Sequence, residues 1–217
     1  MKKLLYYPSL ILFLYGALVF DYYQLQSPPN EIKIGDQIWM GENLNVQRFS
    51  NGDIIKEAKT DQEWVNYCLA EKPAWCYYNN DPKNGLKLGK LYNAYALLDK
   101  RGLAPKGWHI PTHDEWGQLE KFLGKESAGE KLKSKTGWKK GLCSNSTGFS
   151  ALPGGFRYGE GNFMQLNVDC YYWALPEGES DIKYKNSNMR YLTEDNSELT
   201  WGRIDWGVGY SVRCIKN

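Results

Sequence analysis

Two histidines near the middle of the chain lie beside acidic residues, an arrangement that could bind a metal ion. His109 and His113 form an H-x-x-x-H pattern, and Asp114 and Glu115 follow directly. On a single helix this spacing could make a metal-binding pair. Thr112 followed by Glu115, however, is a capping box that starts a helix at residue 113 and leaves His109 outside it. The pattern therefore favours helix capping, with metal binding as the alternative.

The cysteines offer a second kind of chemistry. The sequence contains five: Cys68, Cys76, Cys143, Cys170 and Cys214. In an oxidising compartment they could form two disulfides and leave one free thiol, but sequence alone does not assign the pairs. Cys68 and Cys76 are close enough for a local bridge, which is the first expectation. The absence of a C-x-x-C motif argues against a structural zinc site and against a redox-active dithiol.

Two oxygen-rich stretches could bind calcium. Residues 177–181 contain Glu177, Glu179 and Asp181, and residues 194–198 are also acidic. Carboxylate oxygens in a loop are the ligands that Ca²⁺ prefers, so the three named residues are the metal candidates. The favoured interpretation is a solvated loop in a protein without a cofactor, and calcium is the alternative.

Aromatic residues are the most unusual part of the composition, at 15% of the chain, and they crowd its final quarter. Sugars stack on exposed rings while acids and guanidinium groups hold their hydroxyls, so this mixture suits a glycan or protein ligand. Strand alternation would turn roughly half of these rings inward. The stretch over residues 201–207 has glycines beside its rings and is the best candidate for an exposed patch. The predicted ligand-binding residues are Trp201, Arg203, Asp205, Trp206 and Tyr191.

The length and charge of the chain exclude several classes of protein. Its 217 residues include 27 basic and 25 acidic ones, for a net charge of +2, and 42% are hydrophobic. This composition is that of a globular protein with enough chain to bury a core, which argues against disorder and fibrous repeats. The charge balance gives no general electrostatic reason to bind nucleic acid.

Residues 1–30 differ from the rest of the chain. Lys2 and Lys3 precede an uncharged apolar run from Leu4 to Phe20, and residues 27–30 read as a linker. A basic start followed by an apolar run is typical of a secretory signal, and the run approaches the length of a membrane anchor. We therefore expect a signal sequence or anchor plus linker over residues 1–30. The protein would be exported to the envelope, the cell surface or the medium, with membrane contact only through this segment.

Residues 31–217 are expected to form one α+β domain, with helices early and strands late and no βαβ rhythm. The clearest helix runs over residues 113–123, from the Thr112 cap to Gly124. Further helices are predicted over residues 60–69, 91–98 and 128–135, and residues 79–85 are predicted as a turn-rich segment. Strands are predicted on both sides of the Gly35-Asp36 and Asn51-Gly52 turns and at residues 75–78, 170–175, 189–192 and 209–215.

A series of motifs spaced along this region points to one family. They are Ile38-Trp39-Met40-Gly41-Glu42-Asn43-Leu44, Gly89-Lys90-Leu91-Tyr92-Asn93, Gly107-Trp108-His109-Ile110-Pro111-Thr112, Gly148-Phe149-Ser150-Ala151-Leu152-Pro153-Gly154-Gly155 and Gly209-Tyr210-Ser211-Val212-Arg213-Cys214. In this order they resemble the Fibrobacter succinogenes major paralogous domain, a family of exported bacterial domains of unknown function. The chain departs from the family at Trp173-Ala174-Leu175-Pro176, where hydroxyl residues usually follow the tryptophan.

The resemblance implies a fold and leaves the function open. The family looks like the C-type-lectin-like superfold, close to the formylglycine-generating and sulfatase-modifying enzymes, which implies two or three early helices and a small twisted antiparallel sheet. Those enzymes use a closely spaced cysteine pair, whereas the cysteine nearest to Cys214 is Cys170. The calcium-binding motifs of lectins with this fold are also missing. A fold of this kind hosts both enzymes and binding modules.

We therefore expect an exported or surface-tethered, non-catalytic module that binds a glycan or an envelope protein through its late loops. The alternatives are an enzyme related to the formylglycine-generating oxidases and a structural component of the cell surface. The sequence does not identify the ligand or the oligomeric state.

Overall fold

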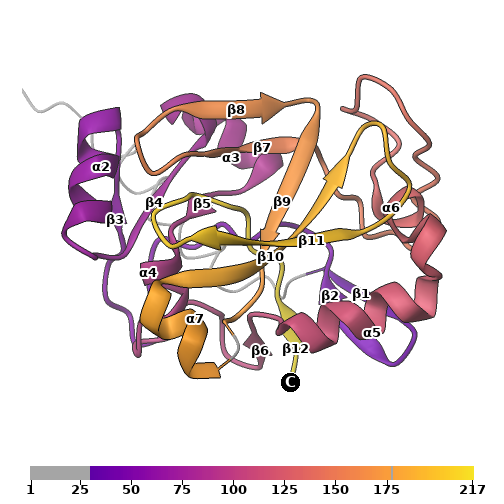
Figure 1. Ribbon diagram of the computed structural model, residues 1–217, viewed down its shortest axis with the longest axis horizontal. Coiled ribbons are helices and arrows are strands. Elements are labelled where there is room, and N and C mark those ends of the chain that lie inside the picture. Colours follow the sequence, from indigo (N-terminus) through magenta and orange to yellow (C-terminus); the bar gives the residue numbers. More distant parts are fainter. Residues whose placement is uncertain (1–29, 177) are drawn as a thin grey trace, which may run out of the picture. The chain divides into compact units, whose positions relative to one another are not determined.

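The computed structural model describes residues 30–176 and 178–217, and for residues 179–181 it describes the backbone alone. Its strands are β1 (Glu31–Ile34), β2 (Gln37–Met40), β3 (Lys56–Glu57), β4 (Ala74–Cys76), β5 (Leu91–Tyr92), β6 (Trp108–His109), β7 (Gly154–Arg157), β8 (Phe163–Leu166), β9 (Asp169–Trp173), β10 (Asn186–Thr193), β11 (Thr200–Asp205) and β12 (Ile215–Lys216). Within the described residues they form three small sheets, with the orders β1-β2-β12-β6, β11-β10-β9-β7-β8 and β3-β4-β5 (Figure 1).

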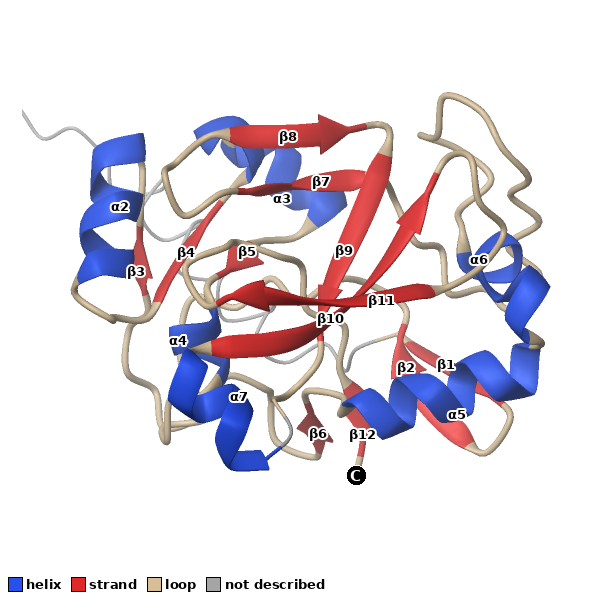
Figure 2. Cartoon of the chain, viewed as in Figure 1, coloured by secondary structure: helices blue, strands red, loops and turns tan. Residues whose placement is uncertain are grey.

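The helices are short and lie around these sheets (Figure 2). They are α2 (Asp61–Leu69), α3 (Pro82–Leu88), α4 (Ala94–Leu97), α5 (His113–Leu123), α6 (Ala128–Leu132) and α7 (Gly178–Tyr184), with 3₁₀ turns at Tyr78–Asn80 and Lys125–Ser127. The prediction of a mixed domain with few helices is confirmed, but several small sheets take the place of the single one expected. None of the helices among the described residues is long and apolar enough to cross a membrane.

The helix starts follow local capping chemistry. At α5 the Thr112 hydroxyl accepts from the Glu115 N–H, and the Glu115 carboxylate accepts from the Thr112 N–H at 2.8 Å. The same reciprocal pair forms between Thr60 and Glu63 at the start of α2. Each pair satisfies two N–H groups that an uncapped helix would leave without partners. Both helices therefore begin where the sequence predicts.

The four-stranded sheet joins segments that are far apart in the chain. β1 and β2 form the expected hairpin, and β12 pairs with β2 on one side and with β6 on the other. Trp39 of β2 packs on Trp116 of α5 with ring centroids 4.6 Å apart, and both rings are fully buried. Phe149 meets both rings edge-on. These contacts place α5 firmly against the domain core.

The five-stranded sheet carries the late aromatic residues. β9, β10 and β11 are antiparallel neighbours, whereas β7 meets β9 in parallel. Alternation along β9 sends Tyr172 toward the helices, where it contacts Trp116 and Phe149. Tyr171 points to the other side and stacks on Tyr191 and Tyr210. The sheet thus separates two aromatic clusters.

Buried guanidinium groups connect the sheets to the loops. Arg213 is 2% exposed and donates to the Asn43 side chain and to the Met40 and Phe149 carbonyls, the last at 2.7 Å. Its guanidinium also lies over the Phe149 ring. Arg157, also buried, donates to Asp61 at 2.8 Å and to the Gly161 carbonyl at 3.0 Å.

Several expectations were wrong in detail. Part of the turn-rich segment over residues 79–85 is the start of α3, because Pro82 occupies its first turn and Asp81 caps it. Residues 91–98 divide into β5 and α4, since the Asn93 side chain caps a new helix start at Ala94. The acidic loop over residues 177–181 becomes the start of α7 from Gly178 onward. The predicted signal or anchor lies outside the described residues, except for Asn30.

The expected Cys68–Cys76 disulfide is not present, because all five cysteines, which lie in the described part of the chain, are free thiols. Cys76, Cys170 and Cys214 are buried, and burial raises the pKa of each thiol to about 12. Burial also raises the pKa of Cys68 to about 11. Thiolate is the reactive form, so the three buried thiols behave as small core residues at neutral pH, while Cys68 remains partly accessible.

Thiol labelling tests this arrangement. We expect iodoacetamide to modify the half-buried Cys143 and Cys68 in the native protein, and to modify Cys76, Cys170 and Cys214 about a hundredfold more slowly until urea unfolds the chain. Peptide mass spectrometry measures each site. A Cys68–Cys76 cross-linked peptide in the unreduced protein would contradict the free-thiol state.

A second test uses an ion pair whose strength depends on pH. Arg101 donates to both oxygens of Asp99, at 2.8 and 2.7 Å, and this holds the pKa of Asp99 below its ordinary value of 3.8. A carboxyl with a lowered folded-state pKa stabilises the protein above its unfolded pKa and loses this effect as the pH falls through the folded value.

We therefore expect Asp99→Asn to lower the free energy of unfolding by about 1 kcal/mol at pH 7. The difference from wild type should shrink as the pH falls from 4 toward 2. Urea unfolding at each pH measures it, with Asp36→Asn in the exposed β1–β2 turn as the matched control. A loss that stays constant over this range would rule out the charge-based explanation.

Candidate functional site

The edge strand β11 presents a row of side chains that the sequence singled out. Trp201, Arg203 and Asp205 alternate with more buried residues and are all exposed, so the three point to one face of the strand. Trp201 is 56% exposed, which is unusual for so large a ring. We call these three residues the Trp201 row. The row is an exposed patch within residues 201–207, where the sequence predicted one.

Trp201 lies beside residues of the neighbouring strand β10 and of α5. Its partner across the ladder is Arg190 of β10, which is buried and forms an ion pair with Glu120 of α5 at 3.0 Å. Arg190 also donates to the His113 carbonyl at 3.2 Å. The His113 ring meets the Trp201 ring nearly at right angles, with centroids 5.3 Å apart. Trp201 is therefore held on a rigid base although most of its surface faces solvent.

The other two predicted ligand residues lie elsewhere. Trp206 is only 9% exposed and packs edge-on against Tyr95, because it alternates with Asp205 and so lies on the opposite face from the row. The Asp205 carboxylate accepts from the Gly207 N–H at 2.7 Å in the turn that follows. The prediction that Trp206 belongs to an exposed patch was wrong. Tyr191 is half-buried on the opposite face of β10, where it stacks on Tyr171.

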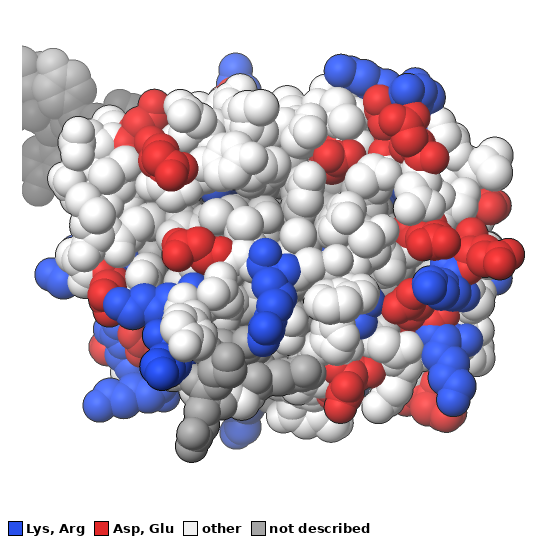
Figure 3. All heavy atoms as spheres, in the orientation of Figure 1, with Lys and Arg blue, Asp and Glu red and all other residues white. Residues whose placement is uncertain are grey.

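The Tyr191 side of the sheet is a second aromatic surface. Tyr171 stacks between Tyr191 and Tyr210, and Phe156 contacts Tyr171 and Tyr158. Tyr158 is exposed, but most of this cluster belongs to the core. Figure 3 shows charged side chains along the margins of the view and also near its centre, and much of the area over β7 is uncharged. Sequence alternation gave no means of placing Tyr158 beside this stack.

Both histidines have structural roles. The two ring nitrogens of His109 lie 2.7 Å from Glu115 Oε1 and 2.7 Å from Asn217 Oδ1. His113 instead packs on Trp201. The capping interpretation thus accounts for Glu115, which holds both the helix start and the His109 ring.

The calcium candidates fall where the structure gives no side-chain geometry. Glu177 lies outside the described residues, as do the side chains of Glu179 and Asp181. Among the residues that are described, no group of three or more His, Cys, Asp or Glu side chains could hold a metal ion. The calcium hypothesis therefore remains a sequence-based expectation.

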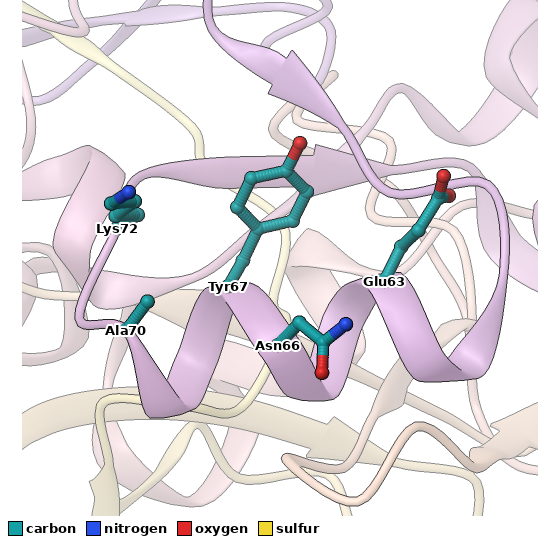
Figure 4. Close-up of a pocket in the computed structure, with 5 residues that line it drawn as sticks. All are labelled: Glu63, Asn66, Tyr67, Ala70 and Lys72. Carbon is teal, nitrogen blue, oxygen red and sulfur yellow. The ribbon is translucent and has the colours of Figure 1, made fainter.

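Two clefts are shallow and open to solvent. The larger, about 340 Å³, lies along α2, where Tyr67 stands between Glu63 and Lys72 (Figure 4). One Glu63 oxygen already accepts from the Lys59 N–H at 2.7 Å and the Thr60 N–H at 3.1 Å, so this carboxylate serves the helix cap. The second, about 270 Å³, lies between α5 and β12 and includes Glu115.

The comparisons with known proteins identify a family. The model of the Fibrobacter succinogenes major domain matches residues 32–216, which is most of the chain and includes every strand from β2 to β12. No curated protein and no solved structure matches the chain. The family is one whose function is unknown, and it assigns no catalytic residues. Because the match covers far more than half of its length, this chain belongs to the Fibrobacter succinogenes major domain family.

Proposed function

We propose that this protein is an exported, non-catalytic module that binds its ligand on the Trp201 row. The observation that carries the proposal is the exposure of Trp201 on a rigid base of His113 and the Arg190–Glu120 ion pair. A soluble protein leaves a large indole exposed at the cost of hydrophobic free energy, and exposed aromatic residues of this kind are enriched where ligands bind.

The three side chains of the row offer complementary chemistry. An indole contributes a flat apolar face, a guanidinium contributes donors and a carboxylate contributes acceptors. The Cα atoms of successive members of the row are about 6.6 Å apart, since each member is two residues further along the strand. Because the row contains one positive and one negative group, it suits an extended ligand of low net charge better than a polyanion.

The absence of catalysis is proposed because the cysteine and histidine side chains that could react have structural roles in the fold. Cys170 and Cys214 are buried as free thiols with raised pKa values, and His109 is held between two oxygens. Chemistry like that of the formylglycine-generating oxidases requires a reactive cysteine pair, which these buried residues do not provide.

A C-type-lectin-like architecture is part of the same proposal. It is supported by β1 and β12, which come from the two ends of the domain and both flank β2, and by the long irregular stretch between α6 and β7. Export is proposed from residues 1–30 alone, where a basic start precedes an apolar run.

The substitution Trp201→Ala tests the proposal. We expect it to weaken ligand binding at least about tenfold, equivalent to about 1.4 kcal/mol, because it removes the flat apolar face. A glycan array and binding assays with envelope proteins supply the ligands, and titration of each hit with both proteins gives the ratio of dissociation constants.

Phe122→Ala is the matched control, since Phe122 is a ring of α5 that is 64% exposed and outside the row. Thermal unfolding should show that both variants remain folded. Equal losses of affinity in the two variants, or ligands that bind the Trp201→Ala protein as tightly as wild type, would contradict the assignment of the site.

A further inference from the structure

The Trp201 row lies on a strand that ends a sheet. In the five-stranded sheet β11 pairs with β10 on one side, and among the described residues no strand pairs with its other side. β11 is also a long edge strand for this domain, running from Thr200 to Asp205 (Figure 1). An edge of this length can accept another strand.

The ladder determines which backbone groups point outward. The Trp206 N–H donates to the Lys185 carbonyl at 3.0 Å, so the pair Lys185–Trp206 continues the hydrogen-bonded positions of β10 and β11. In an antiparallel ladder such pairs alternate with pairs that face away. Ile204, Gly202 and Thr200 therefore direct their N–H and C=O groups toward β10.

It follows that the backbone groups of Trp201 and Arg203 and the N–H of Asp205 point toward the open side of the sheet, while the Asp205 carbonyl accepts from the Val208 N–H at 3.3 Å. A hydrogen bond between β9 and β10 leads to the same assignment. The Ala174 N–H donates to the Asn188 carbonyl, so the backbone of Asn188 faces β9 and the backbone groups of its two neighbours in β10 face β11. The residues of the row thus present their side chains on one face and their main chain at the edge.

We propose that the ligand is an extended segment of a partner protein, which adds to β11 as an antiparallel strand. This inference rests on the proposed function and names its partner class. In an antiparallel pair, directly opposite residues share a face. Charge complementarity then predicts an acidic residue opposite Arg203, a basic one opposite Asp205 and an apolar one opposite Trp201. Binding by strand addition combines main-chain hydrogen bonds with such alternating side-chain contacts.

The other face of β11 favours the same occupant. Ile204 is half-buried there, and Met189 of β10 packs against Gly202, where a Cβ atom would approach the Met189 methyl to 2.7 Å. A strand added to the edge would cover this apolar surface with its remaining side chains. A sugar stacked on Trp201 would contact only one face.

A synthetic peptide tests the inference directly. The probe is Thr-Arg-Val-Glu-Val-Tyr-Thr, which in antiparallel pairing places its Arg, Glu and Tyr opposite Asp205, Arg203 and Trp201. A second peptide with Arg and Glu exchanged puts like charges opposite each other. Two more carry a single N-methyl group, either on the Glu amide, which would face β11, or on the second Val amide, which would face away.

Fluorescence anisotropy with the full chain measures each affinity. We expect N-methylation of the Glu amide to weaken binding at least about tenfold, N-methylation of the Val amide to change it by less than about threefold, and charge exchange to weaken it several-fold. Equal effects of the two N-methyl groups, or no binding of the parent peptide at about 1 mM, would overturn strand addition.

The Trp201→Ala protein separates this inference from the proposed function. If the two N-methyl peptides bind alike but Trp201→Ala still weakens ligands from the array, the row is a binding surface and strand addition is wrong. If Trp201→Ala weakens nothing, the proposed site fails as well. Sedimentation velocity adds one outcome: a dimer that the parent peptide dissociates would make a second copy of this chain the occupant and would overturn the partner assignment.

Discussion

The buried guanidinium of Arg213 is the interaction on which the arrangement of the domain depends. It donates to the Asn43 side chain and to the carbonyls of Met40 and Phe149, and it lies over the Phe149 ring. These partners come from the beginning and the middle of the domain, and Arg213 itself lies near its end. A charge removed from water requires such complete hydrogen bonding. Loss of any one partner would therefore weaken all three segments at once, and with them the four-stranded sheet that supports α5.

A similar constraint fixes the turn that follows β11. The Trp64 indole and the Cys68 thiol both donate to the Gly207 carbonyl, at 3.1 and 3.2 Å. The Trp64 ring also lies against Gly209, where a Cβ atom would approach it to 2.9 Å. Arg157 lies over the same ring and binds Asp61 at the start of α2. The end of β11 is thus tied to α2, while Trp201 at its beginning is tied to α5. The Trp201 row is therefore held at both ends, by α5 at Trp201 and by the turn beside α2 at Asp205.

Local signals made part of this structure predictable. The Thr112 capping box located α5 at residues 113–123, and the glycines beside the rings of residues 201–207 indicated an exposed patch that includes Trp201. Trp206 follows the same alternation onto the opposite, buried face, and the Asp205–Gly207 turn that comes next depends on packing against α2. The support of Trp201 by His113 and Arg190 could not be predicted either. It depends on how α5 lies across β10, which long-range packing of Trp39 and Trp116 decides.

The support of β11 by its neighbours explains how an exposed edge can serve as a binding element in a domain whose two described clefts are open to solvent. A deep pocket would enclose a small ligand, whereas a rigid edge strand offers contacts that repeat with the period of another strand. Because β11 is already ordered by its neighbours, a ligand would not have to order the protein as it binds, and less of the interaction free energy would be lost. The charged residues Arg203 and Asp205 also discourage indiscriminate pairing, since a strand with like charges opposite them is repelled. The same two side chains would therefore protect the edge from aggregation and select its partner.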